Sequence, residues 1–236
     1  YLFLKGDKGY DGWSDDLHRI SEYGGDNVMI SGGTTDPLFF FYNYQRNPNN
    51  SRNNRFWSNS YKAIVGTNTV IERLTEGESA EGDQVLGENY YIRALVFFQM
   101  GNVFGKPYNQ GTDNLSIPLK LTSDIEDLPD RNTVGEVYDQ VIEDLLKAES
   151  LMSINKGPSF ASKEAAQALL SRVYLYMEDN EKAIEYADKV ISSGNYSLLS
   201  PSRFAEMNTL APSENQEAIF SITLTKGIDI PGTEDW

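Results

Sequence analysis

The fold is decided by the stretch ALLSRVYLYMEDNEKAIEYA at residues 168–187, which holds the end of one helical pattern and the start of the next. Apolar residues recur there at three- and four-residue steps, and this spacing predicts helices over 163–178 and 181–193. Only Asp179 and Asn180 are left to connect them. Because a short connection makes consecutive helices antiparallel neighbours, the two helices are expected to form a hairpin.

This hairpin has the residue spacing of a tetratricopeptide unit. The positions that such a unit fills with a large, a small, an aromatic and a small residue hold Leu170, Ser171, Tyr174 and Ala183. Small residues matter at the crossing because they let two helix axes approach while the ring fills the neighbouring gap. The expected fold class is mainly α, with tetratricopeptide-like helical hairpins, long irregular loops and minor β-structure.

Three further helices are expected upstream of the hairpin. Apolar stripes predict helices over 55–74 and 84–104, the second with Asp83 as its N-cap. The third opens with a capping box made by Thr133 and Glu136. The helix over 84–104 is apolar on most sides, so it is expected to lie at the centre of the fold.

The chain outside these helices is rich in Gly, Pro, Asn and Asp. An irregular connection is expected over 105–130, and alternation of apolar with polar residues predicts one strand over 217–225. The sequence therefore predicts a loop-rich segment over 1–54, which can form part of a ligand face, and a tetratricopeptide-like helical domain over 55–200. The predicted strand and the start of a loop-rich region, expected to be truncated, occupy 201–236.

Charge and composition exclude several classes of function. The 236 residues carry 35 acidic and 20 basic side chains, which give a net charge of −15 and argue against binding nucleic acid or anionic lipid. Cysteine is absent, and the single histidine, His18, cannot complete a two-histidine metal motif and is expected at the surface. No apolar run approaches the roughly 20 residues of a membrane span. No metal and no cofactor are expected.

Carboxylates are abundant, but nothing in their spacing selects a catalytic pair. Asp15 with Asp16 and Glu126 with Asp127 lie in or near expected loops, and both pairs are expected to be solvated charges. Residues 7–12 begin like a calcium loop but lack an oxygen ligand at the third position, which favours a glycine-rich turn. No catalytic residue is therefore assigned, and the protein is not expected to be an enzyme.

Three polar residues on apolar helices are expected to serve structure. Asn68 lies in an apolar stripe and is expected to be a buried amide that bonds the backbone of a loop. Glu88 and Arg93 are five residues apart and cannot meet well on one helix. Each is expected to pair with another helix, because buried charges require partners.

The candidate binding site is the stretch TTDPLFFFYNYQRNPNNSRNN, residues 34–54, where aromatic rings stand beside amides and guanidinium groups. Flat rings suit the apolar face of a sugar, and amides and charged groups suit its hydroxyls. The predicted ligand-binding residues are Tyr42, Asn43, Tyr44, Gln45, Arg46, Asn47 and Arg52, with Trp13, Asp26 and Asn27 as possible additions. The alternative is a local aromatic core with solvated polar neighbours.

Four motif blocks within residues 55–225 resemble the SusD/RagB family. They contain Trp57, Tyr61, Ile64, Asn68, Gly87, Glu88, Arg93, Ala94, Phe98, Phe104 and Pro107; Pro118, Leu119, Arg131, Thr133, Glu136, Tyr138, Ile142, Asp144 and Ala148; Ala168, Leu170, Arg172, Tyr174, Tyr176 and Ala183; and Glu217, Ile219 and Phe220. The blocks follow one another in the order of the family, so the resemblance is more specific than any single motif.

The resemblance implies an outer-membrane lipoprotein at the cell surface of Bacteroidetes-type bacteria. Such a protein binds a glycan or another nutrient without breaking bonds and delivers it to a SusC-like TonB-dependent transporter. Family members begin with a lipidated cysteine and are considerably longer. The anchor and a carboxy-terminal half that contributes to the ligand site are therefore expected to be absent from this chain.

Two other functions remain open at this point. A tetratricopeptide-type protein-interaction adaptor would grip a peptide with Lys, Arg and Asn on its inner helical positions, and the helices over 163–178 and 181–193 offer few of these. A glycosidase or another carboxylate enzyme would need two acids that converge in a cleft.

Overall fold

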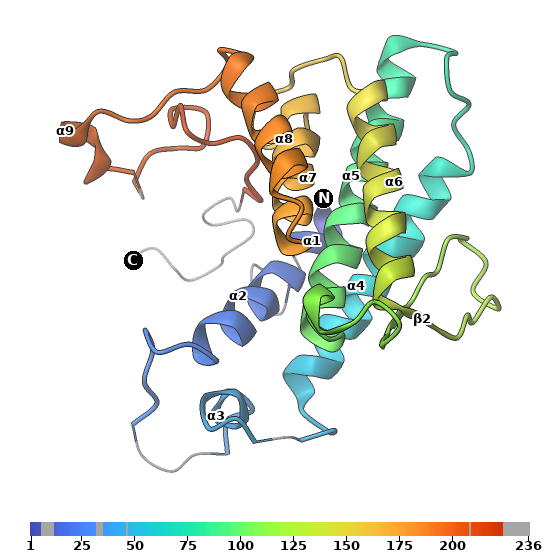
Figure 1. The fold of residues 1–236 in the computed structure, drawn as a ribbon, viewed down its shortest axis with the longest axis vertical. Helices are drawn as coiled ribbons and strands as arrows, with labels where there is room; N and C mark the ends of the chain where they lie inside the picture. Colours follow the sequence, from blue (N-terminus) through green and yellow to red (C-terminus); the bar gives the residue numbers. More distant parts are fainter. Residues whose placement is uncertain (6–11, 32–34, 46, 208, 224–236) are drawn as a thin grey trace. The chain divides into compact units, whose positions relative to one another are not determined.

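The structure is a computed structural model, and Figure 1 shows its fold. It describes residues 1–5, 12–31, 35–45, 47–207 and 209–223. The chain divides into two compact units, Tyr1–Ala63 with Ile222–Trp236, and Ile64–Ser221. The division falls within α4 (Ser51–Ile71), which contributes residues to both units. The boundaries expected at residues 54 and 200 stay predictions.

The unit Ile64–Ser221 is a set of packed helices with one small sheet. After the end of α4, its elements are α5 (Ala80–Phe104), η2 (Tyr108–Gln110), β1 (Leu115–Pro118), β2 (Arg131–Thr133), α6 (Val134–Leu151), α7 (Lys163–Tyr176), α8 (Asn180–Ser192) and α9 (Pro201–Phe204). Helices α5 and α6 lie side by side, and α7 pairs with α8 (Figure 1). The predicted mainly helical fold with tetratricopeptide-like hairpins is confirmed.

Helix α5 forms the core of this unit. Ala94, Val96, Phe97 and Met100 are completely buried on it, as the apolar character of most of its sides predicts. Gly87 lets α6 approach closely, since a Cβ atom there would stand 2.6 Å from Cγ of Met152. Within the part of the chain that the structure describes, no helix is both long enough and apolar enough to span a bilayer.

A buried polar cluster ties α4, α5 and α6 together. Arg93 donates from Nε and Nη2 to the two carboxylate oxygens of Asp144 at 2.8 and 2.6 Å, and from Nη1 to Oδ1 of Asn68 at 2.8 Å. The Asn68 amide nitrogen donates to the carbonyls of Lys120 and Thr122 at 3.0 and 2.9 Å. The structural roles predicted for Asn68 and Arg93 are therefore confirmed.

Glu88 pairs differently from the expectation. Its carboxylate lies 2.6 Å from Nζ of Lys156, which belongs to the segment after α6, and accepts a hydrogen bond from Gln84 on its own helix. This cation lies in the segment after α6, whereas the prediction placed the partner on a second helix. The chain that leaves α6 passes the end of α5 and brings a cation to the buried acid, as a buried charge requires.

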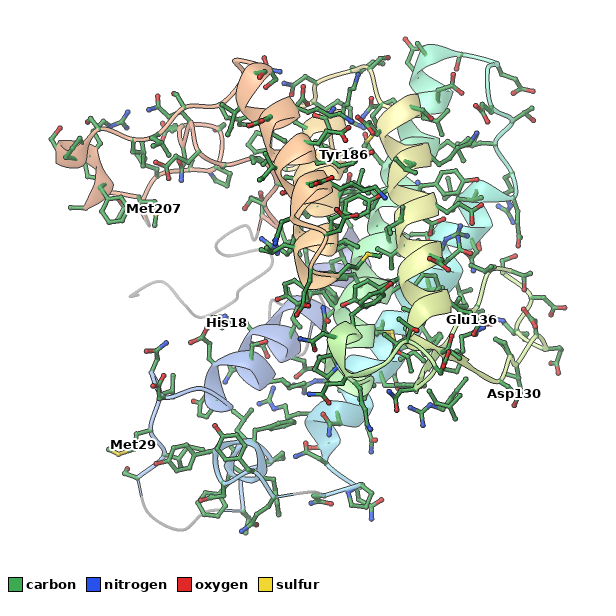
Figure 2. The ribbon with its side chains drawn as sticks, in the orientation of Figure 1. His18, Met29, Asp130, Glu136, Tyr186 and Met207 are labelled. Carbon is green, nitrogen blue, oxygen red and sulfur yellow. The ribbon has the colours of Figure 1, made fainter. Side chains whose placement is uncertain are left out.

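The α7–α8 hairpin has the contacts that its sequence predicts. The hydroxyl of Ser171 donates to the carbonyl of Ala183 at 2.7 Å, so a small residue stands where the two backbones come close. The rings of Tyr174 and Tyr186 stack with centroids 5.5 Å apart, and Figure 2 labels Tyr186 on α8. Glu178 turns the chain with a φ of 64°, in the left-handed conformation that often ends a helix.

Two predicted helix starts were displaced. Helix α5 begins at Ala80 with Ser79 as its N-cap, and Asp83 instead accepts a hydrogen bond from the backbone of Gly77. Helix α4 begins at Ser51 rather than at residue 55. In both cases the first turn has no bulky apolar residue, so the apolar period that predicted the helix becomes visible only one turn later.

The β-structure is not where the sequence predicted it. Strands β1 and β2 pair antiparallel, and β1 lies inside the expected irregular connection. Residues 217–223 form no strand, and 224 and 225 lie outside the described residues. Their apolar side chains instead pack on helices, as shown by the ring of Phe220, 5.1 Å from that of Tyr91. The alternation of apolar and polar side chains over these residues therefore reflects packing against helices. Alternation alone does not make a strand, because a strand also needs a neighbouring strand to pair with.

We expect Asp144→Ala to lower the free energy of unfolding by about 3 kcal/mol or more, because it leaves the Arg93 guanidinium buried without its carboxylate. Lys147→Ala on the same helix is the control, since the ion pair from Lys147 to Glu76 is exposed and should contribute less than about 1 kcal/mol. Urea denaturation measures both. Equal losses in the two variants would contradict the central role of the cluster.

The capping box of α6 predicts a pH dependence. Hydrogen bonds from the backbone N–H and the hydroxyl of Thr133 hold the pKa of Glu136 below its usual value. Because the pKa of Glu136 is lower in the folded state, its carboxylate stabilises the fold at pH values above the unfolded-state pKa. This stabilisation is lost as the pH falls through the folded-state pKa. Glu136→Gln keeps the acceptor but does not titrate, so its stability should fall less between neutral and acid pH in denaturation experiments.

Candidate functional site

The unit Tyr1–Ala63 with Ile222–Trp236 contains an open hollow of about 660 Å³. The unit holds α1 (Leu2–Lys5), α2 (Trp13–Tyr23), α3 (Leu38–Tyr42) and the start of α4, so the segment expected to be mostly loop is partly helical. The described residues that line the hollow are Gly24, Phe40, Phe41, Tyr44, Gln45, Asn47, Pro48, Asn50 and Asn53. They come from the end of α2, from α3 and the loop that follows it, and from the start of α4.

Asn50 fixes the geometry of this loop. It is 3% exposed, its amide nitrogen donates to the carbonyl of Pro37 at 2.9 Å, and its Oδ1 accepts from the backbone N–H of Arg52 at 2.9 Å. One side chain thus satisfies an N–H group at the start of α4 and holds the start of α3 beside it. The walls of the hollow are therefore joined by hydrogen bonds that local sequence supplies.

Tyr44 has the most unusual conformation in the hollow. Its φ is 54°, in the left-handed region that disfavours a residue with a side chain. The backbone N–H groups of Tyr44 and Gln45 donate to the carbonyls of Phe41 and Phe40 at 3.0 and 2.8 Å, which is the hydrogen-bond pattern of a Schellman motif. A tyrosine therefore occupies a position where glycine is the usual residue, and such strain concentrates at functional sites.

The Tyr44 side chain is exposed and also tethered. It is 79% accessible to solvent, and its hydroxyl donates to the carbonyl of Gly24 at 2.7 Å. The hydrogen bond limits rotation of the ring, while the strained backbone directs the ring outward. The result is a flat aromatic face at the edge of the hollow that needs little ordering before it binds a ligand.

An ion-pair cluster joins α2 to the start of α4 in the same unit. Asp16 is completely buried and receives Nε and Nη2 of Arg55 at 2.7 and 2.6 Å, with Nη1 of Arg52 at 3.2 Å. Asp15 accepts from Arg19 at 2.8 Å and from Arg52 at 3.3 Å. The expectation that this acidic pair is solvated was wrong, because Arg52 and Arg55 of α4 pair with Asp16, and Arg19 of α2 pairs with Asp15.

The structure brings only part of the predicted site together. Tyr44, Gln45 and Asn47 line the hollow. The Asn43 amide is exposed but donates to the carbonyl of Phe39, and the Arg52 guanidinium is held in the ion-pair cluster. Tyr42 is half-buried and is not among the described lining residues. Arg46 lies outside the described residues.

The three possible additions have separate positions. Trp13 is 2% exposed and stacks on Phe56 with ring centroids 5.8 Å apart, so it belongs to the core of its unit and not to a ligand surface. Asp26 and Asn27 are exposed in the segment after α2 and are not among the described lining residues. His18 is exposed on α2, where Figure 2 labels it.

Sequence reasoning missed several residues of the hollow. Phe40 and Phe41 were visible as part of the aromatic run, and Asn50 and Asn53 as part of the amide-rich run that follows it. The signal in the sequence was that the aromatic run directly precedes the amide-rich run. A tight turn after α3 brings the two runs together. Gly24 has no such signal, because its place is set by the Tyr44 tether from 20 residues away.

The described residues contain no cluster of three or more His, Cys, Asp or Glu side chains suited to a metal ion. The expected glycine-rich turn at 7–12 falls outside that part of the chain except for Gly12. A smaller hollow of about 210 Å³ in the unit Ile64–Ser221 lies between α5, α7 and the segment at Phe220, and most of its lining side chains are apolar. The amino-terminal hollow is therefore the better candidate for a polar ligand.

Comparison with known proteins gives one consistent relationship. The family described as "Starch-binding associating with outer membrane" matches residues 20–175. "SusD-like protein P38" of Formosa agariphila is 26% identical over 181 residues, which are 75% of this chain and 34% of that protein. "SusD-like protein P2" of the same organism is 30% identical over 156 residues, which are 64% of this chain and 29% of that protein.

Solved structures show the same relationship. The crystal structure of a SusD superfamily protein from Bacteroides thetaiotaomicron matches with a TM-score of 0.85 at 26% identity, over 98% of this chain and 52% of that chain. A "Laminarin binding SusD-like protein" shares the fold with a TM-score of 0.72 at 22% identity, over 87% of this chain and 46% of that one. The chain thus spans about a third of the curated relatives and about half of the solved ones.

The fold and the hollow define a class: a mainly helical protein with tetratricopeptide-like hairpins and an open surface of aromatic rings and amides. Within that class the relationship is specific, because the match to the family covers most of the helical region and runs from α2 to α7. The chain belongs to the SusD/RagB family. The resemblance recognised in the sequence motifs is confirmed.

The left-handed backbone at Tyr44 predicts an order of stability between two variants. Tyr44→Gly and Tyr44→Ala both remove the ring and its tether, but only glycine adopts a positive φ without strain. We expect the glycine variant to be more stable than the alanine variant by roughly 1 kcal/mol in urea denaturation. Equal stabilities would mean that the turn after α3 takes another conformation in solution.

Proposed function

We propose that the protein binds a glycan at the amino-terminal hollow and does not transform it. The observation that carries this proposal is the exposed and tethered ring of Tyr44 beside a set of amides. A sugar ring presents apolar C–H groups on one face and hydroxyls around its rim, and an aromatic face with polar neighbours meets both. The family description as starch-binding supports the same ligand class.

The chemistry of the hollow supports binding without catalysis. Hydrolysis of a glycosidic bond needs two carboxyl groups about 5 to 10 Å apart on either side of the bond. None of the described residues that line the hollow is acidic, and the nearby Asp15 and Asp16 are already paired with arginines. Because both carboxylates are held in ion pairs, neither is available as an acid or a base for proton transfer.

The partner and the location follow from the family. We propose that the protein acts at the cell surface of the outer membrane, held there by a lipid anchor, and delivers the glycan or another nutrient to a SusC-like TonB-dependent transporter. The family description supports association with the outer membrane. A net charge of −15 is in keeping with a glycan ligand, because capture of a neutral sugar needs no clustered cations.

A second candidate function has one observation in its favour. Ile184 and Ile191 on α8 are 61% and 73% exposed, seven residues apart on the same helical face. An adaptor that binds other proteins through its helical hairpin would use such a face. If a Tyr44 variant loses glycan binding and the double variant Ile184→Ser with Ile191→Ser keeps it, the glycan-binding proposal is favoured over the adaptor.

Isothermal titration with a neutral starch oligosaccharide, maltoheptaose, and a neutral β-glucan oligosaccharide, laminarihexaose, tests the proposal. We expect at least one to bind, and Tyr44→Gly to weaken that binding by about tenfold or more, since a stacked aromatic anchor often contributes more than about 1.4 kcal/mol. Tyr176→Ala, an exposed tyrosine of the other unit, is the control and should leave affinity unchanged.

The same samples test the absence of catalysis. The bound oligosaccharide should be recovered at full length after prolonged incubation, as judged by chromatography and by an assay for reducing ends. Release of reducing ends that depends on the protein would overturn the non-enzymatic assignment. Binding that survives Tyr44→Gly would place the glycan elsewhere on the molecule.

A further inference from the structure

The loop that joins β1 to β2 projects from the helices and holds three apolar side chains in water (Figure 1). Leu121, Ile125 and Leu128 are 40%, 75% and 83% exposed. Exposed apolar side chains that gather in one place mark a site of protein interaction more often than single ones do. We propose that residues 121–130 are a docking surface for a partner protein with an apolar recess edged by Lys or Arg. This surface lies in the unit Ile64–Ser221 and is separate from the proposed glycan site.

A buried lysine closes the loop on itself. Lys120 is 7% exposed, and its Nζ donates hydrogen bonds to the backbone carbonyls of Asp124 and Asp127. Each of these three residues directly precedes one of the three exposed apolar residues in the sequence. The ammonium group therefore fixes the backbone beside every one of the apolar side chains.

Helix α4 fastens the same loop from outside. The Asn68 amide nitrogen donates to the carbonyls of Lys120 and Thr122 at 3.0 and 2.9 Å. The Glu72 carboxylate accepts from the backbone N–H of Ser123 at 2.7 Å and also from its hydroxyl. A loop held in this way loses little conformational freedom on binding, and such preorganisation favours a tight complex.

The charges of the loop indicate the chemistry of its partner. Residues 121–130 contain no Lys or Arg and four acidic side chains, which are Asp124, Glu126, Asp127 and Asp130, the last of them labelled in Figure 2. Protein interfaces combine an apolar centre with a polar rim, and complementary charge selects the right partner. A recess that accepts Ile125 and Leu128 should therefore be edged by cationic side chains.

The same charges argue against other occupants of the surface. Anionic lipid headgroups and nucleic acid would both be repelled by the acidic side chains of the loop. A second copy of this chain carries the same net charge of −15, so it would be repelled as well. A partner protein with a basic rim is the occupant that the loop fits best.

Peptides of known sequence can test the surface. A random dodecapeptide library displayed on phage is selected in parallel on the unmodified protein, on the double variant Ile125→Ser with Leu128→Ser, and on Ile184→Ser with Ile191→Ser as the matched control on α8. We expect one class of peptides to combine Leu, Phe or Trp with Lys or Arg. This class should be enriched on the unmodified protein and on the control, and should be absent from the loop variant.

Isothermal titration with the most enriched synthetic peptide of this class measures the effect. We expect the loop variant to bind it at least about tenfold more weakly than the unmodified protein, and the α8 control to bind it within about twofold. Circular dichroism should show the same fold in all three proteins, because only exposed side chains are changed. Lack of such a peptide class, or equal binding by the three proteins, would overturn the proposal.

A second pair of variants separates local charge from overall charge. Glu126→Gln with Asp130→Asn removes two exposed acids of the loop, and Glu181→Gln with Asp188→Asn removes two exposed acids of α8. We expect only the loop pair to weaken peptide binding, by about threefold or more at low salt and by less at high salt. Equal losses in both pairs would mean that overall charge attracts the peptides, and would contradict the docking surface.

Two other occupants are tested with the same loop variant, Ile125→Ser with Leu128→Ser. If the unmodified protein binds phosphatidylglycerol vesicles and this variant does not, the loop contacts a membrane and the proposal is wrong. If sedimentation shows self-association that this variant loses, the loop contacts a second copy and the proposal is equally wrong. Failure of glycans to bind would overturn the proposed function and leave the docking surface standing, since the two involve different units of the chain.

Discussion

Arg93 is 6% exposed, and the helical unit is arranged so that its buried charge has partners. Its guanidinium donates hydrogen bonds to Asp144 of α6 and to Asn68 of α4. The Asn68 amide nitrogen in turn donates to the backbone carbonyls of Lys120 and Thr122 in the loop. A buried ion pair adds little net stability over an apolar contact, but a mispaired one is very unfavourable. The cluster therefore specifies which faces of three helices meet.

The packing around this cluster depends on small residues at the places where helices approach. Gly87 leaves room for the end of α6, and Ser171 both leaves room for α8 and donates to its backbone. Close approach at these two points explains why the hairpins can stack as tetratricopeptide-like units. The frame is thus determined by interactions deep in the unit.

The amino-terminal unit is organised by different forces. Its hollow is built from short helices and loops that are held by Asn50, by the Schellman motif at Tyr44 and by the ion pairs of Asp16. The ring that we place at the centre of the ligand site is also the residue with a strained backbone. Strain of this kind persists where a side chain is useful in a position that stability alone would give to glycine.

Local patterns were sufficient to predict much of the helical frame. The capping box at Thr133, the hairpin around Asp179 and the buried amide at Asn68 were all predicted, because each depends on residues near in sequence or on the rule that buried polar groups need partners. The polar first turns of α4 and α5 were missed, since a helical period cannot be seen where apolar residues are lacking.

The sequence by itself determined the helices, the family and the composition of the binding segment. The tertiary structure alone decided which aromatic rings are buried and which are exposed. In the sequence, Trp13 and Tyr44 are both candidates to bind a sugar. In the structure, Trp13 stacks on Phe56 in the core, whereas the hydroxyl of the exposed Tyr44 donates to the carbonyl of Gly24. It also decided that Asp16 and Arg52 serve structure. Burial and long-range pairing depend on which segments meet in space, and no local pattern carries that information.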